Sequence, residues 1–121
     1  MDQSIAVSAS RRSVVTSISV PQALLAEMLK AVNKTGRAAR GDIATITVSI
    51  PYPLLQALDE LVKRRGEHVN RGVLVRLAIS KAINFLRESG LYGSGAVESL
   101  GALVRLGLLL LLHDEARGGV E

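Results

Sequence analysis

The sequence predicts a mainly α-helical protein that contains a short β-ribbon, and three features carry that prediction. Residues 45–50 alternate strictly between hydroxyl and aliphatic side chains, as in a strand with one polar and one apolar face. Pro51 ends this strand, and an amphipathic helical pattern starts at once. A second amphipathic pattern follows after a break at Gly66. Because a lone two-faced strand cannot bury its apolar side, we expect it to pair with another strand.

The composition limits the possible functions. The chain of 121 residues suffices for one small domain with extensions, and its net charge of +4 suits a polyanionic partner. Three aromatic residues are too few for base stacking along single-stranded nucleic acid. With no cysteine, neither a disulfide framework nor a thiolate metal site can form, and we expect no metal and no cofactor. The start of the chain lacks a secretory pattern, so the expected location is the cytoplasm.

The first part of the chain divides into two segments. Residues 1–12 are small, polar and unpatterned, which predicts a flexible N-terminus. Residues 13–42 contain a strand-like pattern, a helical pattern and a basic linker that carries Lys34, Arg37 and Arg40. Shifted by 30 residues, the first two patterns align with the strand and helix of the central segment. This alignment indicates a degenerate strand-helix repeat, with chance similarity of two amphipathic stretches as the alternative.

The central segment, residues 43–89, is predicted to form the strand and two helices. The first helix should run from about Pro51 to Arg65, because a proline in the first turn loses no intrahelical hydrogen bond. Asn70 is a good N-cap for a second helix over residues 71–88. The apolar stripe of this second helix is wide enough to meet two partners at once.

The last segment, residues 90–121, combines a glycine-rich joint with a helix expected over residues 96–117. Residues 106–112 are nearly all leucine, but Glu98 and Arg105 interrupt the apolar stretch, which is shorter than a bilayer requires. We therefore interpret it as an apolar packing or oligomerisation helix. A membrane-associated helix is the alternative.

With these elements in order, residues 43–86 resemble the ribbon-helix-helix family of DNA-binding proteins. The resemblance rests on the alternating strand, the Pro51 stop, the two helices and the Gly66 break between them. It implies an intertwined homodimer, or a higher even-numbered oligomer, in which one strand from each of two chains forms an antiparallel ribbon. Residues 13–42 would then be an accessory strand-helix, and the C-terminal helix an extra element. The expected dimer core comprises Ile46, Val48, Ile50, Leu58, Leu74 and Ala78.

The resemblance also implies the contacts with DNA. The outward side chains of the ribbon, Thr45, Thr47 and Ser49, would read base edges in the major groove. Phosphate contacts would come from Asn70 and Arg71 at a helix N-terminus and from Arg40 in the linker. Family members often carry longer polar side chains on the ribbon, so DNA shape or contacts of the basic linker would supply part of the specificity here. The alternatives are a merely solvated strand face and an ordinary helix cap.

Three functional hypotheses follow. The first is sequence-specific binding of double-stranded DNA by a homodimeric transcriptional regulator, typically a repressor, located with the nucleoid. The second is an antitoxin-type or other protein-interaction module whose C-terminal helix binds a partner. The third pairs the two strand-helix units within one chain as a pseudo-dimer, but the first unit lacks a second helix, which favours an accessory role. An enzyme is not expected, because His68 and His113 are far apart and without a suitable carboxylate arrangement.

Overall fold

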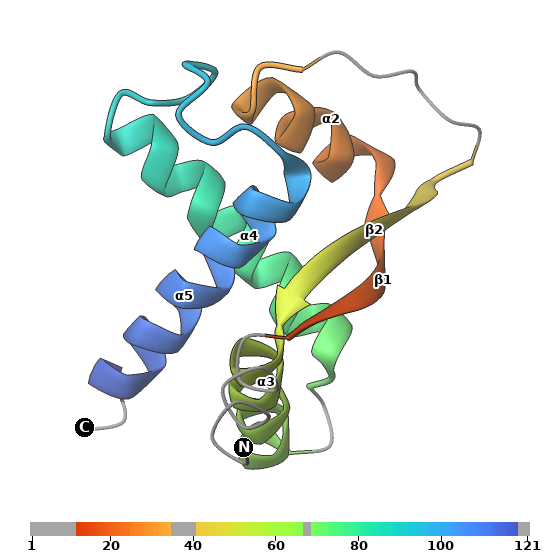
Figure 1. The fold of residues 1–121 in the computed structure, drawn as a ribbon, viewed down its shortest axis with the longest axis vertical. Helices are drawn as coiled ribbons and strands as arrows, with labels where there is room; N and C mark the ends of the chain where they lie inside the picture. The colour runs from red at the N-terminus through yellow and green to blue at the C-terminus, as the bar shows by residue number, and fades with distance from the viewer. Residues whose placement is uncertain (1–11, 35–40, 67–68, 119–121) are drawn as a thin grey trace, which may run out of the picture.

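The fold is that of a computed structural model, which describes residues 12–34, 41–66 and 69–118. It is mostly helical with one two-stranded antiparallel sheet, which confirms the predicted class (Figure 1). The expectation of a flexible N-terminus concerns residues that, apart from Arg12, lie outside the described ranges, as do Arg37, Arg40 and His68. In chain order the elements are β1 (Ser13–Pro21), α2 (Gln22–Ala31), β2 (Ile43–Pro51), α3 (Tyr52–Arg65), α4 (Arg71–Glu88) and α5 (Leu100–Gly118).

Local signals set the ends of the central helices. Pro51 precedes α3, and Gly66 ends it with a φ of 95°, a conformation that costs glycine little. The side chain of Asn70 accepts a hydrogen bond from the amide of Val73 and so caps α4. Both helices therefore have the predicted bounds, to within one residue. The last helix begins at Leu100 rather than at residue 96, because Ser99 provides its N-terminal cap.

The partner of β2 is the other strand of the same chain. β1 and β2 pair antiparallel from Ser13 opposite Pro51 to Pro21 opposite Ile43. This corrects the expectation that the partner strand belongs to a second copy and that residues 13–42 are accessory. The physical reason is proximity: β1 has a matching pattern and is joined to β2 within the same chain by residues 22–42, so its effective concentration exceeds that of a strand on another molecule.

The register of the two strands gives the ribbon an approximate two-fold symmetry. The central residues of the strands, Ser17 and Thr47, lie opposite one another, and they are also equivalent in the repeat with a shift of 30. The two ends of the ribbon match as well. The amide of Gln22 donates to the carbonyl of Asp42 at 2.9 Å, and the amide of Tyr52 donates to that of Arg12 at 2.7 Å. The repeat predicted from the sequence is therefore present in the three-dimensional structure.

The helices follow the same relation. α2 packs on β1 as α3 packs on β2, while α4 contacts β1 and α5 contacts β2. We call β1, α2 and α5 the first half-unit, and β2, α3 and α4 the second half-unit. Buried side chains of α2 and α3 also correspond, because Met28 and Ala31 take the places of Leu58 and Leu61. In this way α5 gives the first half-unit its second helix, although β2 and not a helix follows α2 along the chain.

The core lies between the inner face of the ribbon and the four helices (Figure 1). The residues expected in a dimer core are all buried inside this single chain: Ile46, Val48, Ile50, Leu58, Leu74 and Ala78. One polar side chain, Thr16, is buried with them, and its hydroxyl donates to the carbonyl of Val14 at 3.2 Å. The apolar side of α5 belongs to the same core, so α5 is a packing helix within the chain.

α4 and α5 cross at very short range. A Cβ atom added to Gly107 would lie 2.1 Å from the carbonyl oxygen of Ala78, so only glycine fits there. Around this crossing, Leu103, Val104 and Leu108 of α5 are fully buried against α4 and the rest of the core. Within the described ranges, none of the helices combines the length and apolar character that crossing a bilayer requires.

We predict that Gly107→Ala lowers the free energy of unfolding by about 3 kcal/mol, because the two backbones must separate. The measurement is urea denaturation followed by circular dichroism. Gly101→Ala, in the same helix, is the matched control. Its added methyl group would lie 3.1 Å from the flexible end of Arg105 and 3.9 Å from Ser99 Oγ, so its stability should lie within about 1 kcal/mol of the unchanged protein. Equal losses in both variants would contradict the close crossing.

An ion pair joins α2 to the end of α4. Arg87 donates to Glu27 at 2.5 Å, the hydroxyl of Tyr92 donates to the same carboxylate at 3.1 Å, and the guanidinium lies 4.8 Å from the Tyr92 ring centre. The hydrogen bond from Arg87, and then that from Tyr92, lowers the pKa of Glu27 below its ordinary value.

Since a lowered folded-state pKa stabilises the protein above the unfolded-state pKa, this contribution should disappear as the pH falls through 4.5 and below. We predict that Glu27→Gln flattens the dependence of the melting temperature on pH between neutral and acid conditions. Glu60→Gln, on the exposed side of α3, serves as the control and should follow the unchanged protein. Identical pH profiles for the Glu27 variant and the unchanged protein would refute this role.

Candidate functional site

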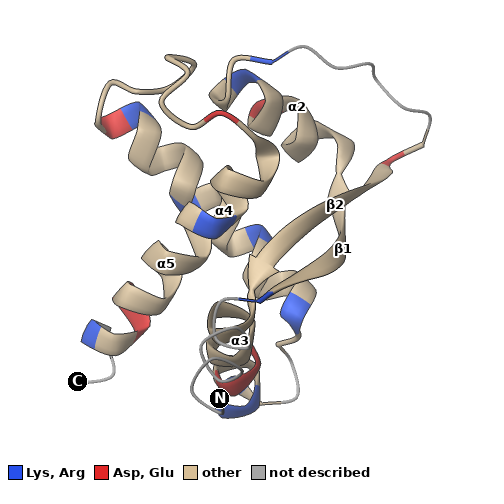
Figure 2. Cartoon of the chain, in the orientation of Figure 1, with Lys and Arg blue, Asp and Glu red and all other residues tan. Residues whose placement is uncertain are grey.

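The outward face of the ribbon carries small hydroxyl side chains from both strands. Thr45, Thr47 and Ser49 are all exposed, and opposite them in β1 lie Ser19, Ser17 and Val15. Neither strand contains a charged residue, and the charges lie at the ribbon ends, on the helices and in connecting segments (Figure 2). The surface is therefore a neutral strip of hydrogen-bonding groups, with Val15 as an apolar exception that is 70% exposed.

The backbone amide and carbonyl groups of the outward-facing residues point toward the outer edges of the ribbon. Because the pairs Gln22–Asp42 and Tyr52–Arg12 are hydrogen bonded, and such pairs alternate in an antiparallel ladder, the outward-facing residues form the non-hydrogen-bonded pairs. Their amides and carbonyls point away from the partner strand. Each edge would be open to pairing with another chain if no other group covered it.

Each of the two long helices places an arginine at a different edge of the ribbon. Arg76 of α4 donates to the carbonyl of Ser19 at 3.4 Å, and Arg105 of α5 donates to that of Ser49 at 2.8 Å. Ser19 and Ser49 are equivalent positions in the repeat, so the two arginines are equivalent as well. Each guanidinium has five N–H groups, so a single carbonyl leaves capacity for further acceptors.

The helix N-termini beside these arginines are built alike. Ser99 caps α5 as Asn70 caps α4: its hydroxyl accepts from the amide of Ala102 at 3.0 Å, and the Asn70 side chain accepts from Val73 at 2.9 Å. Two residues after each cap stands a glycine, and a Cβ atom there would lie 3.4 Å from Arg76 Nη1 or 3.1 Å from Arg105 Nη1. The missing side chains let each arginine fold back beside its helix terminus.

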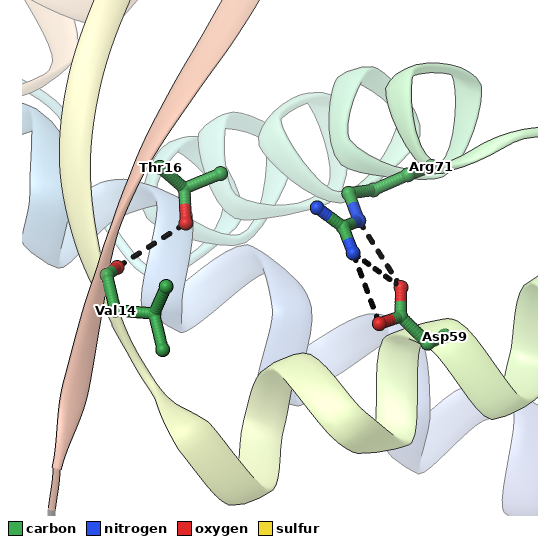
Figure 3. Close-up of polar contacts among 4 residues, drawn as sticks. All are labelled: Val14, Thr16, Asp59 and Arg71. Carbon is green, nitrogen blue, oxygen red and sulfur yellow. Dashed lines mark hydrogen bonds and ion pairs between the residues drawn. The ribbon is translucent and has the colours of Figure 1, made fainter.

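Arg71, the residue expected to contact phosphate, has a partner within the chain. Its guanidinium forms a bidentate ion pair with Asp59 of α3, with distances of 2.9 Å from Nη2 to both carboxylate oxygens (Figure 3). Both side chains are nearly half exposed. The pair joins α3 to the start of α4 and compensates the charge of Arg71 locally. The first half-unit has Leu100 at the equivalent position, so this ion pair belongs to one half-unit only.

The site contains residues that the sequence analysis did not identify. Ser17, Ser19 and Val15 were assigned to an accessory segment, although the shift of 30 residues that aligns the strands would have placed them on the same face. A second repeat marks Ser99 and Arg105. Residues 70–79 align with residues 99–108 at a shift of 29. Five of the ten aligned pairs are identical, namely those of Gly72, Leu74, Val75, Arg76 and Leu77. Of the expected contact residues, Thr45, Thr47, Ser49, Asn70 and Arg71 lie in described segments, and Arg40 does not.

Comparisons with known proteins do not add to these observations. Neither a scan against protein-family models nor searches of curated proteins and of solved structures found a match. Among the described residues, no group of histidine and acidic side chains is arranged to hold a metal ion. The candidate functional groups are the ribbon, its flanking arginines and the two capped helix termini.

We predict that Asn70→Ala and Ser99→Ala each lower the free energy of unfolding by about 1 kcal/mol, because each removes the cap of one long helix. Urea denaturation measures both effects. Ser80→Ala, at an exposed position in the middle of α4, should leave stability nearly unchanged. A loss in the Asn70 variant without a comparable loss in the Ser99 variant would mean that the two termini are not equivalent.

Proposed function

We propose that this protein binds double-stranded DNA as a single-chain member of the ribbon-helix-helix class and acts as a transcriptional regulator. In this proposal the β1–β2 ribbon enters the major groove with its hydroxyl face toward the base edges. One chain would supply what two chains supply in a homodimer. Such a role would place the protein in the cytoplasm with the nucleoid.

The observation that carries the proposal is the outward face of the ribbon. Five exposed hydroxyl side chains lie within two residues of the central pair Ser17–Thr47, that pair included, and Ser13 adds a sixth at one end of the ribbon. A major groove about 12 Å wide admits a two-stranded ribbon, and serine and threonine can donate to or accept from base edges. An exposed, uncharged strip of this kind avoids the cost of burying an unpaired charge on binding.

The flanking helices support phosphate binding on both sides of the ribbon. The amides in the first turn of an α-helix lack intrahelical acceptors and carry the positive end of the helix dipole. Here two such termini, at Asn70 and Ser99, stand at equivalent positions, each with an arginine between the terminus and the ribbon edge. Anion binding at both termini would hold the ribbon across the groove, and the net charge of +4 would favour the approach to DNA.

The protein-interaction alternative has less support. It requires the C-terminal helix to offer its apolar side to a partner protein. In α5, however, Leu103, Val104, Leu108 and Leu111 are buried in the chain's own core. Releasing α5 would expose these side chains and also remove Arg105 from the ribbon edge.

We predict that Thr47→Asp weakens binding to duplex DNA by at least about tenfold, because it places a negative charge at the centre of the ribbon face. Fluorescence anisotropy with a labelled duplex measures the affinity. Ser80→Asp is the matched control: it makes the same kind of change at an exposed position of α4 and should affect affinity much less.

For the unchanged protein, the logarithm of the association constant should fall linearly with the logarithm of the salt concentration. The slope should be about −2 or steeper, because at least two phosphates would be contacted. The mass of the complex should correspond to one chain for each ribbon-sized site. Failure to bind duplex DNA at low salt would refute the proposed function. Equal losses in the two aspartate variants would refute the assignment of the ribbon as the contact surface.

A further inference from the structure

The two ends of the ribbon face are not chemically equivalent. The two-fold arrangement makes Val15 equivalent to Thr45, since each lies two residues from the central pair and opposite a serine. Val15 is 70% exposed and offers only methyl groups, whereas Thr45 offers a hydroxyl group as well. A symmetric homodimer cannot have this difference, because both of its strands carry the same residue.

A second difference lies further out. Ile43, 59% exposed, lies at the outer end of β2, where the equivalent residue of β1 is Ser13. At about 3.3 Å for each residue, Val15 lies about 7 Å from the centre of the ribbon and Ile43 about 13 Å from it, in the opposite direction. Each end of the ribbon therefore has one exposed aliphatic side chain, but at a different distance from the centre.

From this we propose that the protein recognises a non-palindromic DNA site, in which Val15 selects a thymine in one half-site through its 5-methyl group. The inference rests on the proposed DNA binding and specifies its target. Thymine alone presents a methyl group in the major groove, and an aliphatic side chain contacts it without needing a hydrogen bond. At the equivalent place in the other half-site, Thr45 can also donate to or accept from a base edge. The two half-sites should therefore differ in sequence.

Valine and threonine have nearly the same shape, so exchanging one for the other changes the chemistry of the contact and not its size. The experiment is selection of duplexes from a random library with the full chain, with Val15→Thr and with Thr45→Val. The unchanged protein should enrich an asymmetric site. Val15→Thr should enrich a site in which the two positions contacted by residues 15 and 45 have the same base preference, that of the Thr45 half-site, while the unlike central pair Ser17–Thr47 stays unchanged. Thr45→Val should also make these two positions alike, with the preference of the Val15 half-site.

Removal of one methyl group from the DNA provides an independent measurement. Deoxyuridine in place of the thymidine in the Val15 half-site should weaken binding of the unchanged protein by about fourfold. The same replacement should have little effect on Val15→Ala, whose shorter side chain does not reach the methyl group. An equal loss in both proteins would overturn the assignment of Val15.

The outcomes separate this inference from the function on which it rests. A palindromic site for the unchanged protein, or an identical site for all three proteins, would overturn the inference and leave DNA binding in place. Absence of any enriched or bound duplex would overturn the proposed function itself. Because Val15 and Thr45 are both exposed on the ribbon, thermal melting of the two variants should match that of the unchanged protein.

Discussion

The crossing of α4 and α5 is the contact on which the rest of the structure depends. At Gly107 the backbone of α5 comes so close to the carbonyl of Ala78 that a single methyl group would not fit between them. This close approach lets the two helices share one core and brings α5 against β2, while α4 lies against β1. Without it, the first half-unit would have a strand and one short helix but no second helix to cover the ribbon.

The covalent connection between the half-units changes the physical character of the ribbon. When two chains form a ribbon, its stability depends on concentration, and both halves must have the same sequence. In this protein the strands belong to one chain, so the ribbon forms at high effective concentration and its two halves are free to differ. The differences between Val15 and Thr45, and between Arg71 and Leu100, are of this kind.

The sequence predicts part of the candidate site, namely the outward face of β2 and the cap of α4, and it contains signals for much of the rest. The hydroxyl face of β2 follows from strict alternation, and the cap at Asn70 follows from its residue type and position. The face of β1 follows from its alignment with β2, but no second helix follows α2 directly in the chain, so the sequence favours an accessory role for β1. The repeat that relates Asn70 to Ser99 and Arg76 to Arg105 is harder to recognise, because the leucine run of residues 106–112 gives the C-terminal segment an apolar pattern of its own.

The sequence alone determined the local structure of this protein: which residues form strands, where α3 and α4 begin and end, and which side of each is apolar. Periodicity, caps and helix-stopping residues act over a few positions, so they can be recognised without knowing the rest of the fold. Only the tertiary structure decided that β2 pairs with β1 and that α5 completes the first half-unit. These choices depend on contacts between residues far apart in the chain, such as Gly107 with Ala78 and Arg105 with Ser49, for which no local pattern specifies the partner.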